Sequence, residues 1–176
     1  MTLAVACGIN HSLFLGVDGL VRSSGMNTDG QRAGGSRTRP IVGLTGVVRV
    51  VCGGYSSFCV DLDGAVWSFG GNQEGQLGIG TRKPQLKPAR ISFDVSISVV
   101  AASDEHALFL DSDCNVWSCG RNLYGQLGLG DTSNRVTPER IPTLSNVRDI
   151  AAGSSHSIFV VEDYTLWGSG TNHHGE

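Results

Sequence analysis

The sequence contains little charge and no long apolar run. Charged residues make up 16% of the 176 residues and hydrophobic residues 40%, a balance that excludes an intrinsically disordered chain. The net charge of −3 lacks the positive excess with which proteins bind nucleic acid or an anionic membrane surface. No segment reaches the roughly 20 consecutive apolar residues that span a bilayer. We therefore expect neither a nucleic acid nor a membrane as a direct partner.

Cysteine is also scarce, and its spacing shows no pairing. The five cysteines are odd in number, and no Cys-x-x-Cys motif occurs. Such cysteines are typical of reduced thiols and not of a secreted disulfide framework. The first residues, Met-Thr-Leu-Ala-Val-Ala-Cys-Gly, lack the basic segment and the long apolar run of a signal peptide. These features indicate a cytoplasmic or nuclear protein.

Glycine, by contrast, is abundant, and much of it belongs to a repeated motif. The segment Gly-Gly-Asn-Gln-Glu-Gly-Gln-Leu-Gly-Ile-Gly at 70–80 returns as Gly-Arg-Asn-Leu-Tyr-Gly-Gln-Leu-Gly-Leu-Gly at 120–130. Another copy begins at Gly170, and an altered copy opens at Gly25. A period of about 50 residues is typical of repeat architectures, so we interpret the chain as one repeat domain. Its units cover about 1–46 (degenerate), 47–96, 97–146 and 147–176 (truncated).

Each unit predicts four short β-strands. In the second unit, Asp63-Gly64 marks a tight hairpin turn, and an exposed loop is expected over 81–88. No segment has a sustained helical period. Four antiparallel strands in a unit of about 50 residues predict the blade of a β-propeller, and hence an all-β fold. The strands expected in this unit are 47–52, 57–62, 65–69 and 89–93.

The third unit resembles the repeats of the regulator of chromosome condensation family. That family's unit runs Gly-x-x-His-Ser/Ala-x-x-Leu, then Asp-Gly-x-Val-Trp-Ser-x-Gly-x-Asn-x-x-Gly-Gln-Leu-Gly-x-Gly, and the segment 104–130 follows it closely. The resemblance covers the whole chain, more loosely over residues 1–45. It implies a β-propeller, usually of seven blades in this family, of which the chain holds about three and a half. We therefore expect a ring that this chain alone does not close.

Residues that recur at one place in each unit are interpreted as structural. Glycines allow the backbone to turn sharply between strands, and tryptophans pack blade against blade. The recurring histidines could in principle bind zinc, but Ser56 takes their place in the second unit, and we favour hydrogen bonds to neighbouring backbone. These positions are Gly70, Gly75, Gly78, Gly120, Gly125, Gly128, Trp67, Trp117, Trp167, His11, His106 and His156.

The sequence shows no catalytic constellation. No serine, histidine and aspartate occur in a nucleophile setting, and no pair of carboxylates stands apart from the turn positions. No metal-binding motif is present either. We therefore expect no enzyme activity, no metal and no cofactor.

The variable loops are the candidate binding surface. The segments 34–40, 81–88 and 131–138 occupy one place in each unit, and they differ while the surrounding strands repeat. Such loops line one face of a propeller, where a partner docks. The alternative, that they are solvated connections, carries equal weight. The candidate partner-binding residues are Arg37, Arg39, Arg82, Lys83, Lys87, Asp131, Asn134 and Arg135.

Three functions follow from these patterns, and the favoured one is a protein–protein interaction scaffold. The resemblance also implies guanine-nucleotide exchange on a Ran-type small GTPase, although the repeat spacing leaves no room for the inserted β-wedge of the family's founding member. A third function is that of a regulatory propeller fragment of a larger protein, such as a kinase or a ubiquitin ligase. An open ring exposes blade edges, so self-association is a further expectation.

Overall fold

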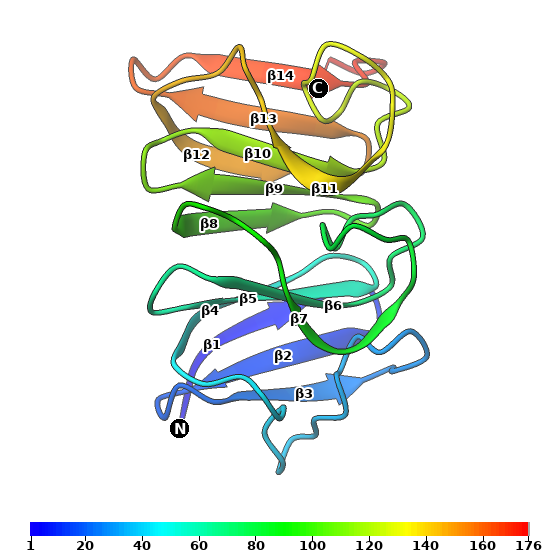
Figure 1. Cartoon of the computed structure of the whole chain (residues 1–176), viewed down its shortest axis with the longest axis vertical. Helices are drawn as coiled ribbons and strands as arrows, with labels where there is room; N and C mark the ends of the chain where they lie inside the picture. Colours follow the sequence, from blue (N-terminus) through cyan, green and yellow to red (C-terminus); the bar gives the residue numbers. More distant parts are fainter. Residues whose placement is uncertain (176) are drawn as a thin grey trace.

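The computed structural model describes residues 1–175, which form 14 strands in four antiparallel sheets and no helix. The sheets follow one another along the chain and stack face to face as the blades of an open ring (Figure 1). This arrangement confirms the prediction of an all-β propeller that the chain does not close. The described residues thus contain no helix that is long and apolar enough to cross a membrane.

Two blades have four strands and two have three. The order within each sheet follows the chain, and each blade is a meander of hairpins. The first strands are neighbours from blade to blade, because β1 contacts β4, β4 contacts β8 and β8 contacts β12. Blade 1 holds β1 (Thr2–Cys7), β2 (His11–Gly16) and β3 (Val21–Gly25); blade 2 holds β4 (Val47–Cys52), β5 (Ser56–Asp61), β6 (Val66–Gly70) and β7 (Gln85–Arg90); blade 3 holds β8 (Ile97–Ala102), β9 (His106–Asp111), β10 (Val116–Gly120) and β11 (Arg135–Arg140); blade 4 holds β12 (Val147–Ala152), β13 (His156–Val161) and β14 (Leu166–Gly170).

The prediction for the outer strands was wrong. The fourth strand of the second unit was expected over 89–93, but β7 begins at Gln85, inside the expected loop 81–88. Its counterpart β11 likewise begins at Arg135, inside the expected loop 131–138. Pro88 and Pro138 lie within these strands. The strands β7 and β11 lie at the edges of their sheets and pair on one side only. A proline, which has no backbone N–H to donate, is therefore tolerated there when its nitrogen lies on the unpaired side.

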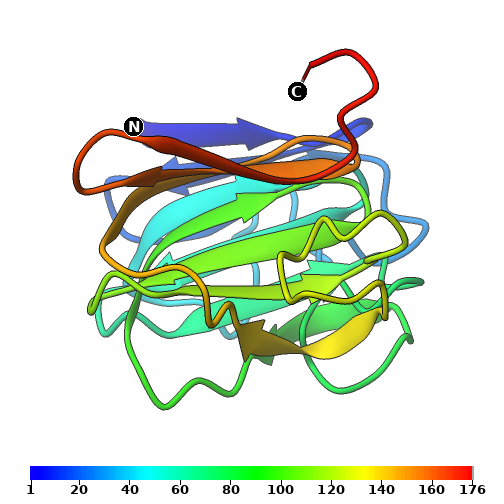
Figure 2. The same ribbon diagram turned by 90° about the horizontal axis from the view of Figure 1, so that it is seen from above.

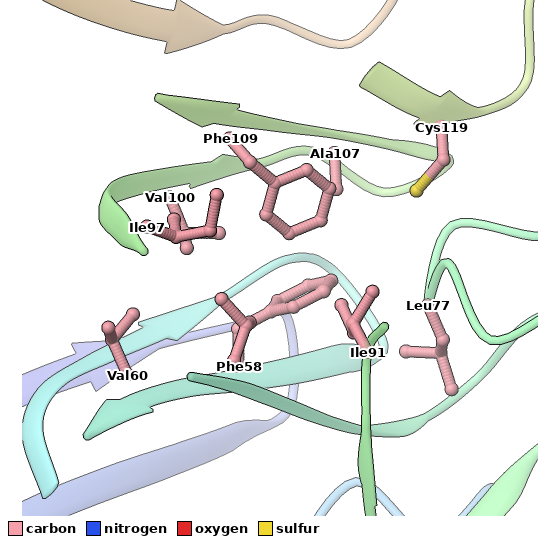
Figure 3. Close-up of a cluster of buried hydrophobic side chains, with 10 residues drawn as sticks. Phe58, Val60, Leu77, Ile91, Ile97, Val100, Ala107, Phe109 and Cys119 are labelled. Atoms are coloured by element: carbon pink, nitrogen blue, oxygen red, sulfur yellow. The ribbon is translucent and has the colours of Figure 1, made fainter. Parts of the chain in front are cut away.

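Apolar clusters between successive blades make up the core. Between blades 2 and 3, Phe58 and Val60 face Val100 and Phe109 (Figure 3). The rings of Phe58 and Phe109 meet edge to face, with 6.1 Å between centroids and an interplanar angle of 71°. Similar clusters lie between blades 1 and 2 and between blades 3 and 4. Because each blade buries its faces only against its neighbours, the junction of two blades is the stabilising unit of this fold.

In blades 2 and 3 a tryptophan joins the hairpin corner to a blade junction. Trp117 packs against the cluster between blades 2 and 3, and its Nε1 donates a hydrogen bond to Asp111 Oδ2 at 2.9 Å. The other oxygen of Asp111 accepts from two backbone N–H groups of the turn. Trp67 and Asp61 repeat the contact at 3.1 Å in blade 2. The tryptophan therefore orients the corner as well as packing between blades.

Replacing Trp117 by phenylalanine should lower the free energy of unfolding by about 1–2 kcal/mol, because it removes a hydrogen bond to a carboxylate and some packing area. Trp167→Phe is the matched control. Val161 stands in blade 4 where Asp111 stands in blade 3, and Trp167 is 55% exposed, so its loss should stay below about 0.5 kcal/mol. Urea denaturation measures both. Equal losses would show that the corner hydrogen bond contributes nothing.

Candidate functional site

The glycine loops and the turns before each second strand lie on one side of the molecule. Ser56 at the start of β5 pairs with Gly70 at the end of β6, so the turn 53–55 and the loop 71–84 leave the sheet at the same end. The corresponding segments of the other blades do the same, and they gather on the right of Figure 1. Figure 2 looks along the stack and shows loops beyond both ends of the strands. We call this side the glycine-loop face.

A pocket of about 510 Å³ opens on the glycine-loop face. Its lining comes from all four blades and includes the carboxylates of Asp29, Glu74, Asp104 and Glu105 together with Tyr55. Among the residues that the structure describes, no lysine, arginine or histidine lines this pocket. The pocket therefore presents negative charge next to an aromatic ring.

The carboxylates of this acidic pocket differ in how they are engaged. Glu105 pairs with the guanidinium of Arg121, and Glu74 Oε2 accepts from Asn134 Nδ2 at 2.7 Å. Asp104 is exposed, and within the part of the chain that the structure describes its carboxylate accepts no hydrogen bond. Asp104 is thus the carboxylate most open to a partner's positive charge.

Exposed apolar and aromatic side chains lie on the same glycine-loop face: Tyr55 lines the pocket, and Leu123 and Tyr124 belong to the glycine loop of blade 3. Tyr55 is 39% exposed, Leu123 is 56% exposed and Tyr124 is 51% exposed. The Arg121 guanidinium lies 5.9 Å from the centroid of the Tyr124 ring, a cation–π distance. Tyrosine and arginine are the residues most enriched at the energetic centres of protein interfaces. The glycine-loop face therefore has the composition of a protein-docking surface.

Sequence reasoning missed Asp29, Glu74 and Tyr124 because they belong to the repeated glycine motif, which was interpreted as structural. Tyr55, Asp104 and Glu105 lie outside that motif, in the turns before the second strands of their blades. A usable signal was present in the motif Gly-x-Asn-x-x-Gly itself. The two positions between asparagine and glycine vary from unit to unit, and they hold Thr28-Asp29, Gln73-Glu74, Leu123-Tyr124 and His173-His174. Variable positions inside an otherwise fixed loop indicate residues that the fold does not require.

The sequence-predicted loop residues are distributed differently. Arg82 and Lys83 are exposed beside the glycine loop, and Lys87 is exposed on the edge strand β7. In the first unit, Arg37 donates from Nε to Ser24 Oγ at 3.1 Å, and Arg39 is exposed.

Three more of these candidates contact their own chain. Arg135 pairs with Asp131 at 2.7 Å and with Glu139 at 2.8 Å. Asn134 accepts from the Asn122 backbone N–H, in addition to its contact with Glu74. Asp131, Asn134 and Arg135 thus hold the glycine loop of blade 3 in place, and Asn134 also connects it to blade 2.

Hydrogen bonds to neighbouring backbone were expected for the recurring histidines, and His11 and His106 each contact the next blade through a serine side chain. His11 Nε2 lies 2.9 Å from Ser57 Oγ, whose hydroxyl donates to the Gln31 carbonyl oxygen at 2.8 Å. His106 and Ser157 repeat this contact at 2.9 Å, and Ser157 Oγ donates to the Gln126 carbonyl oxygen at 2.7 Å. We call this arrangement the histidine–serine contact. Residues 1–175 contain no group of three or more His, Cys, Asp or Glu that could hold a metal ion.

A larger pocket, of about 770 Å³, lies at the edge of blade 4 beside Trp167. In blades 2 and 3 a fourth strand pairs with the strand that carries the tryptophan, whereas β14 has no such partner among the described residues. This pocket therefore follows from an unpaired strand edge, and we do not treat it as a binding site.

Comparison with known proteins agrees with this geometry. One model of the regulator of chromosome condensation (RCC1) repeat matches residues 63–110 and 113–160, and a second matches 3–31, 47–76, 97–126 and 147–176. No curated protein sequence matches the chain significantly.

Solved structures of RCC1 and of human WBSCR16 are similar to this chain. Yeast RCC1 (Prp20), in its complex with Kap60, is 25% identical with a TM-score of 0.85, and the match covers 97% of this chain and 44% of that chain. Prp20p from Saccharomyces cerevisiae, described with its binding properties to Gsp1p and histones, is 25% identical with a TM-score of 0.85, and the match covers 96% of this chain and 45% of that chain. Human WBSCR16 is 26% identical with a TM-score of 0.85, and the match covers 96% of this chain and 47% of that chain. The chain thus spans less than half the length of these proteins. It belongs to the regulator of chromosome condensation (RCC1) repeat family.

Proposed function

We propose that this chain is a non-enzymatic protein–protein interaction scaffold that docks a partner on its glycine-loop face. The observation that carries the proposal is the acidic pocket, lined by the exposed Tyr55, with Tyr124 exposed beside the Arg121 that pairs with Glu105. An exposed, unengaged carboxylate such as Asp104 favours a partner segment that carries lysine or arginine. The complex of yeast RCC1 with Kap60 and the binding of Prp20p to Gsp1p and histones support a protein partner for a propeller of this kind. Free cysteines fit a reducing cytoplasmic or nuclear compartment.

Binding of purified Gsp1p and of purified core histones, measured by isothermal titration calorimetry, tests the proposal. Asp104→Ser introduces the residue that blade 4 carries at the same position, Ser154, so it should leave the fold unchanged. Because it removes the open carboxylate, it should weaken binding of the partner about tenfold, and Tyr124→Ala should weaken it by a similar factor.

The matched control is Asp94→Ser, which makes the same change of charge at an exposed aspartate in the connection between β7 and β8, at the opposite end of the strands. It should bind as the unchanged chain does. Equal weakening by Asp104→Ser and Asp94→Ser would show that only the net charge matters and would contradict docking on the glycine-loop face. Absence of binding to both proteins would remove these two partners.

Guanine-nucleotide exchange is the second candidate function. It is favoured by the TM-score of 0.85 with Prp20p, a structure described together with its binding to Gsp1p. Release of labelled GDP from Gsp1p, with and without this chain, separates the two functions. Acceleration by the chain would assign exchange, whereas binding without acceleration would support a scaffold.

A further inference from the structure

Positive charge is concentrated in two segments of blades 1 and 2. Seven of the 13 lysine and arginine residues lie in 30–40 and 75–93, and these two segments contain no aspartate or glutamate. Five of the seven are exposed in the turn 36–39, the loop 81–84 and the first half of β7. We call these five, Arg37, Arg39, Arg82, Lys83 and Lys87, the basic rim. Although the whole chain has a net charge of −3, this part of its surface is positive.

A contact between the two blades brings the segments together. A Cβ at Gly30 would lie 2.5 Å from the Gln85 carbonyl oxygen and 2.6 Å from Leu86 Cα, so the loop of blade 1 lies on the start of β7. The rim residues of blade 2 flank this contact in the sequence, and those of blade 1 follow Gly30 in the same loop. The basic rim therefore spans two neighbouring blades.

Hydrogen bonds hold the loop of blade 2 in one shape. Asn72 is fully buried, and its Nδ2 donates to the carbonyl oxygens of Thr81 at 2.7 Å and of Lys83 at 3.0 Å. The Lys83 backbone N–H also donates to Thr81 Oγ1 at 3.2 Å. Asn72 thus fixes the backbone on both sides of Arg82. A ligand that binds here orders exposed side chains and no backbone, which lowers the entropic cost of binding.

The turn of blade 1 is closed in a similar way. Ser36 Oγ accepts from the backbone N–H groups of Thr38 at 3.3 Å and of Arg39 at 3.0 Å. Arg37 is anchored through Nε, which donates to Ser24 Oγ at 3.1 Å, and within residues 1–175 its two terminal nitrogens have no partner. A guanidinium presents such nitrogens in the fork that matches a carboxylate.

The charge of the basic rim is not neutralised within the chain. None of its five side chains forms an ion pair in the part of the chain that the structure describes. Blade 3 differs, because its Arg135 pairs with both Asp131 and Glu139. A lysine on an edge strand discourages pairing with a further strand, which explains Lys87 but not the charges of the two fixed loops.

From this unpaired charge we infer that the basic rim binds an acidic segment of a partner protein, an extended stretch of aspartate and glutamate whose carboxylates pair with both blades. This surface is distinct from the acidic pocket and does not depend on the function proposed for it. Nucleic acids bind proteins through many phosphate contacts and through stacking on aromatic rings. The rim offers five cations and no aromatic ring, and the neighbouring acidic pocket repels a polyanion. A protein segment is therefore the favoured ligand.

Fluorescence anisotropy with a labelled, unstructured peptide of alternating glutamate and serine tests the inference. The peptide should bind the unchanged chain at low ionic strength, and its affinity should fall as salt is added, because exposed ion pairs are screened. Replacing both Arg82 and Lys83 by glutamine should weaken binding about tenfold, and Arg37→Gln about threefold. The same peptide with glutamine in place of glutamate should not bind.

The matched control is the double variant Arg49→Gln with Arg140→Gln. It removes the same charge from two exposed arginines that lie toward the opposite ends of their blades, and it should bind the acidic peptide as the unchanged chain does. Asp104→Ser should not weaken this binding either, so a failure of the acidic pocket and a failure of the basic rim are told apart. Circular dichroism checks that every variant is folded.

Four results would overturn the inference. Absence of binding of the glutamate peptide, or equal binding of the glutamine peptide, would show that carboxylates are not recognised. Equal weakening by the control double variant would show that only the net charge matters. A single-stranded oligonucleotide of the same charge that binds more tightly than the peptide, and loses its affinity when Arg82 and Lys83 are replaced, would assign the basic rim to a nucleic acid.

Discussion

Gly120→Ala is expected to lower the free energy of unfolding by about 3–4 kcal/mol, among the largest effects of any single substitution in this chain. Gly120 ends β10 with a φ of +104°, a backbone conformation that L-residues rarely adopt. A Cβ there would lie 2.3 Å from the Glu105 carbonyl oxygen and 2.7 Å from His106 Cα. Since His106 pairs with Gly120 across β9 and β10, neither strand can move away without breaking the ladder.

Gly130→Ala is the matched control for Gly120→Ala. Its φ of +82° imposes similar backbone strain, but a Cβ there would meet nothing within 4 Å. Strain alone should cost about 1–2 kcal/mol. Urea denaturation of both variants separates the strain from the collision. Equal losses would show that β9 and β10 yield to the added methyl group and that the repeated glycine is not needed for close approach.

Much of the fold could be predicted from the sequence because each local signal pointed to the same structure. The Asp63-Gly64 turn, the alternating strands and the period of about 50 residues all favour a meander of short hairpins. Even Gly120 was correctly interpreted as a backbone requirement, because a glycine that recurs at one place in every unit marks a place where the chain must turn.

The outer strands were missed because local and tertiary preferences conflict there. Pro88 and Pro138 argue locally against a strand, and nothing in the sequence says which side of the strand is paired. Pairing on one side only is a property of the assembled blade.

The binding face and the histidine–serine contact were missed for a different reason. His106 and Ser157 are 51 residues apart, and they meet only because two blades stack with a fixed offset. A repeat shows which positions are equivalent, but not which equivalent positions of neighbouring blades touch. The same limit hid the convergence of Asp29, Glu74 and Asp104 in one pocket, since these residues come from three different units.

His106 should make the stability of the protein depend on pH. Its ring is fully buried, with Nε2 at 2.9 Å from Ser157 Oγ and Nδ1 at 2.8 Å from Ser103 Oγ. Because the Ser157 hydroxyl donates to the Gln126 carbonyl oxygen, the Nε2–H group donates to Ser157 Oγ, and the Ser103 hydroxyl also lies 3.2 Å from the His106 carbonyl oxygen. Ser103 Oγ already accepts from the backbone N–H groups of Glu105 and His106, so it is poorly placed to accept another proton. Burial, together with the nearby His156, lowers the pKa of His106 to about 4.

The unfolded chain, in which the pKa is near 6.5, binds more protons than the folded chain between pH 6.5 and about 4. Stability is therefore fully present above pH 6.5 and is lost as the pH falls, by about 2 kcal/mol between pH 7 and pH 5. Burial also lowers the pKa of His11, which adds a loss of the same sign. The Arg135 guanidinium lowers the pKa of Asp131, so the stability that such carboxylates contribute is lost only at lower pH. Between pH 7 and pH 5 the change in stability therefore comes from the histidines.

Urea denaturation at pH 7, 6 and 5, at one protein concentration, measures this dependence, and His106→Ser isolates the share of His106. Blade 2 already carries Ser56 at this position, so serine is compatible with the blade. The variant should be less stable at pH 7, because it loses the contact with Ser157, but its stability should fall much less between pH 7 and pH 5. A fall as steep as that of the unchanged chain would show that His106 is not the group that titrates. The proton would then be taken up elsewhere, and the histidine–serine contact would join the blades without making their junction sensitive to acid.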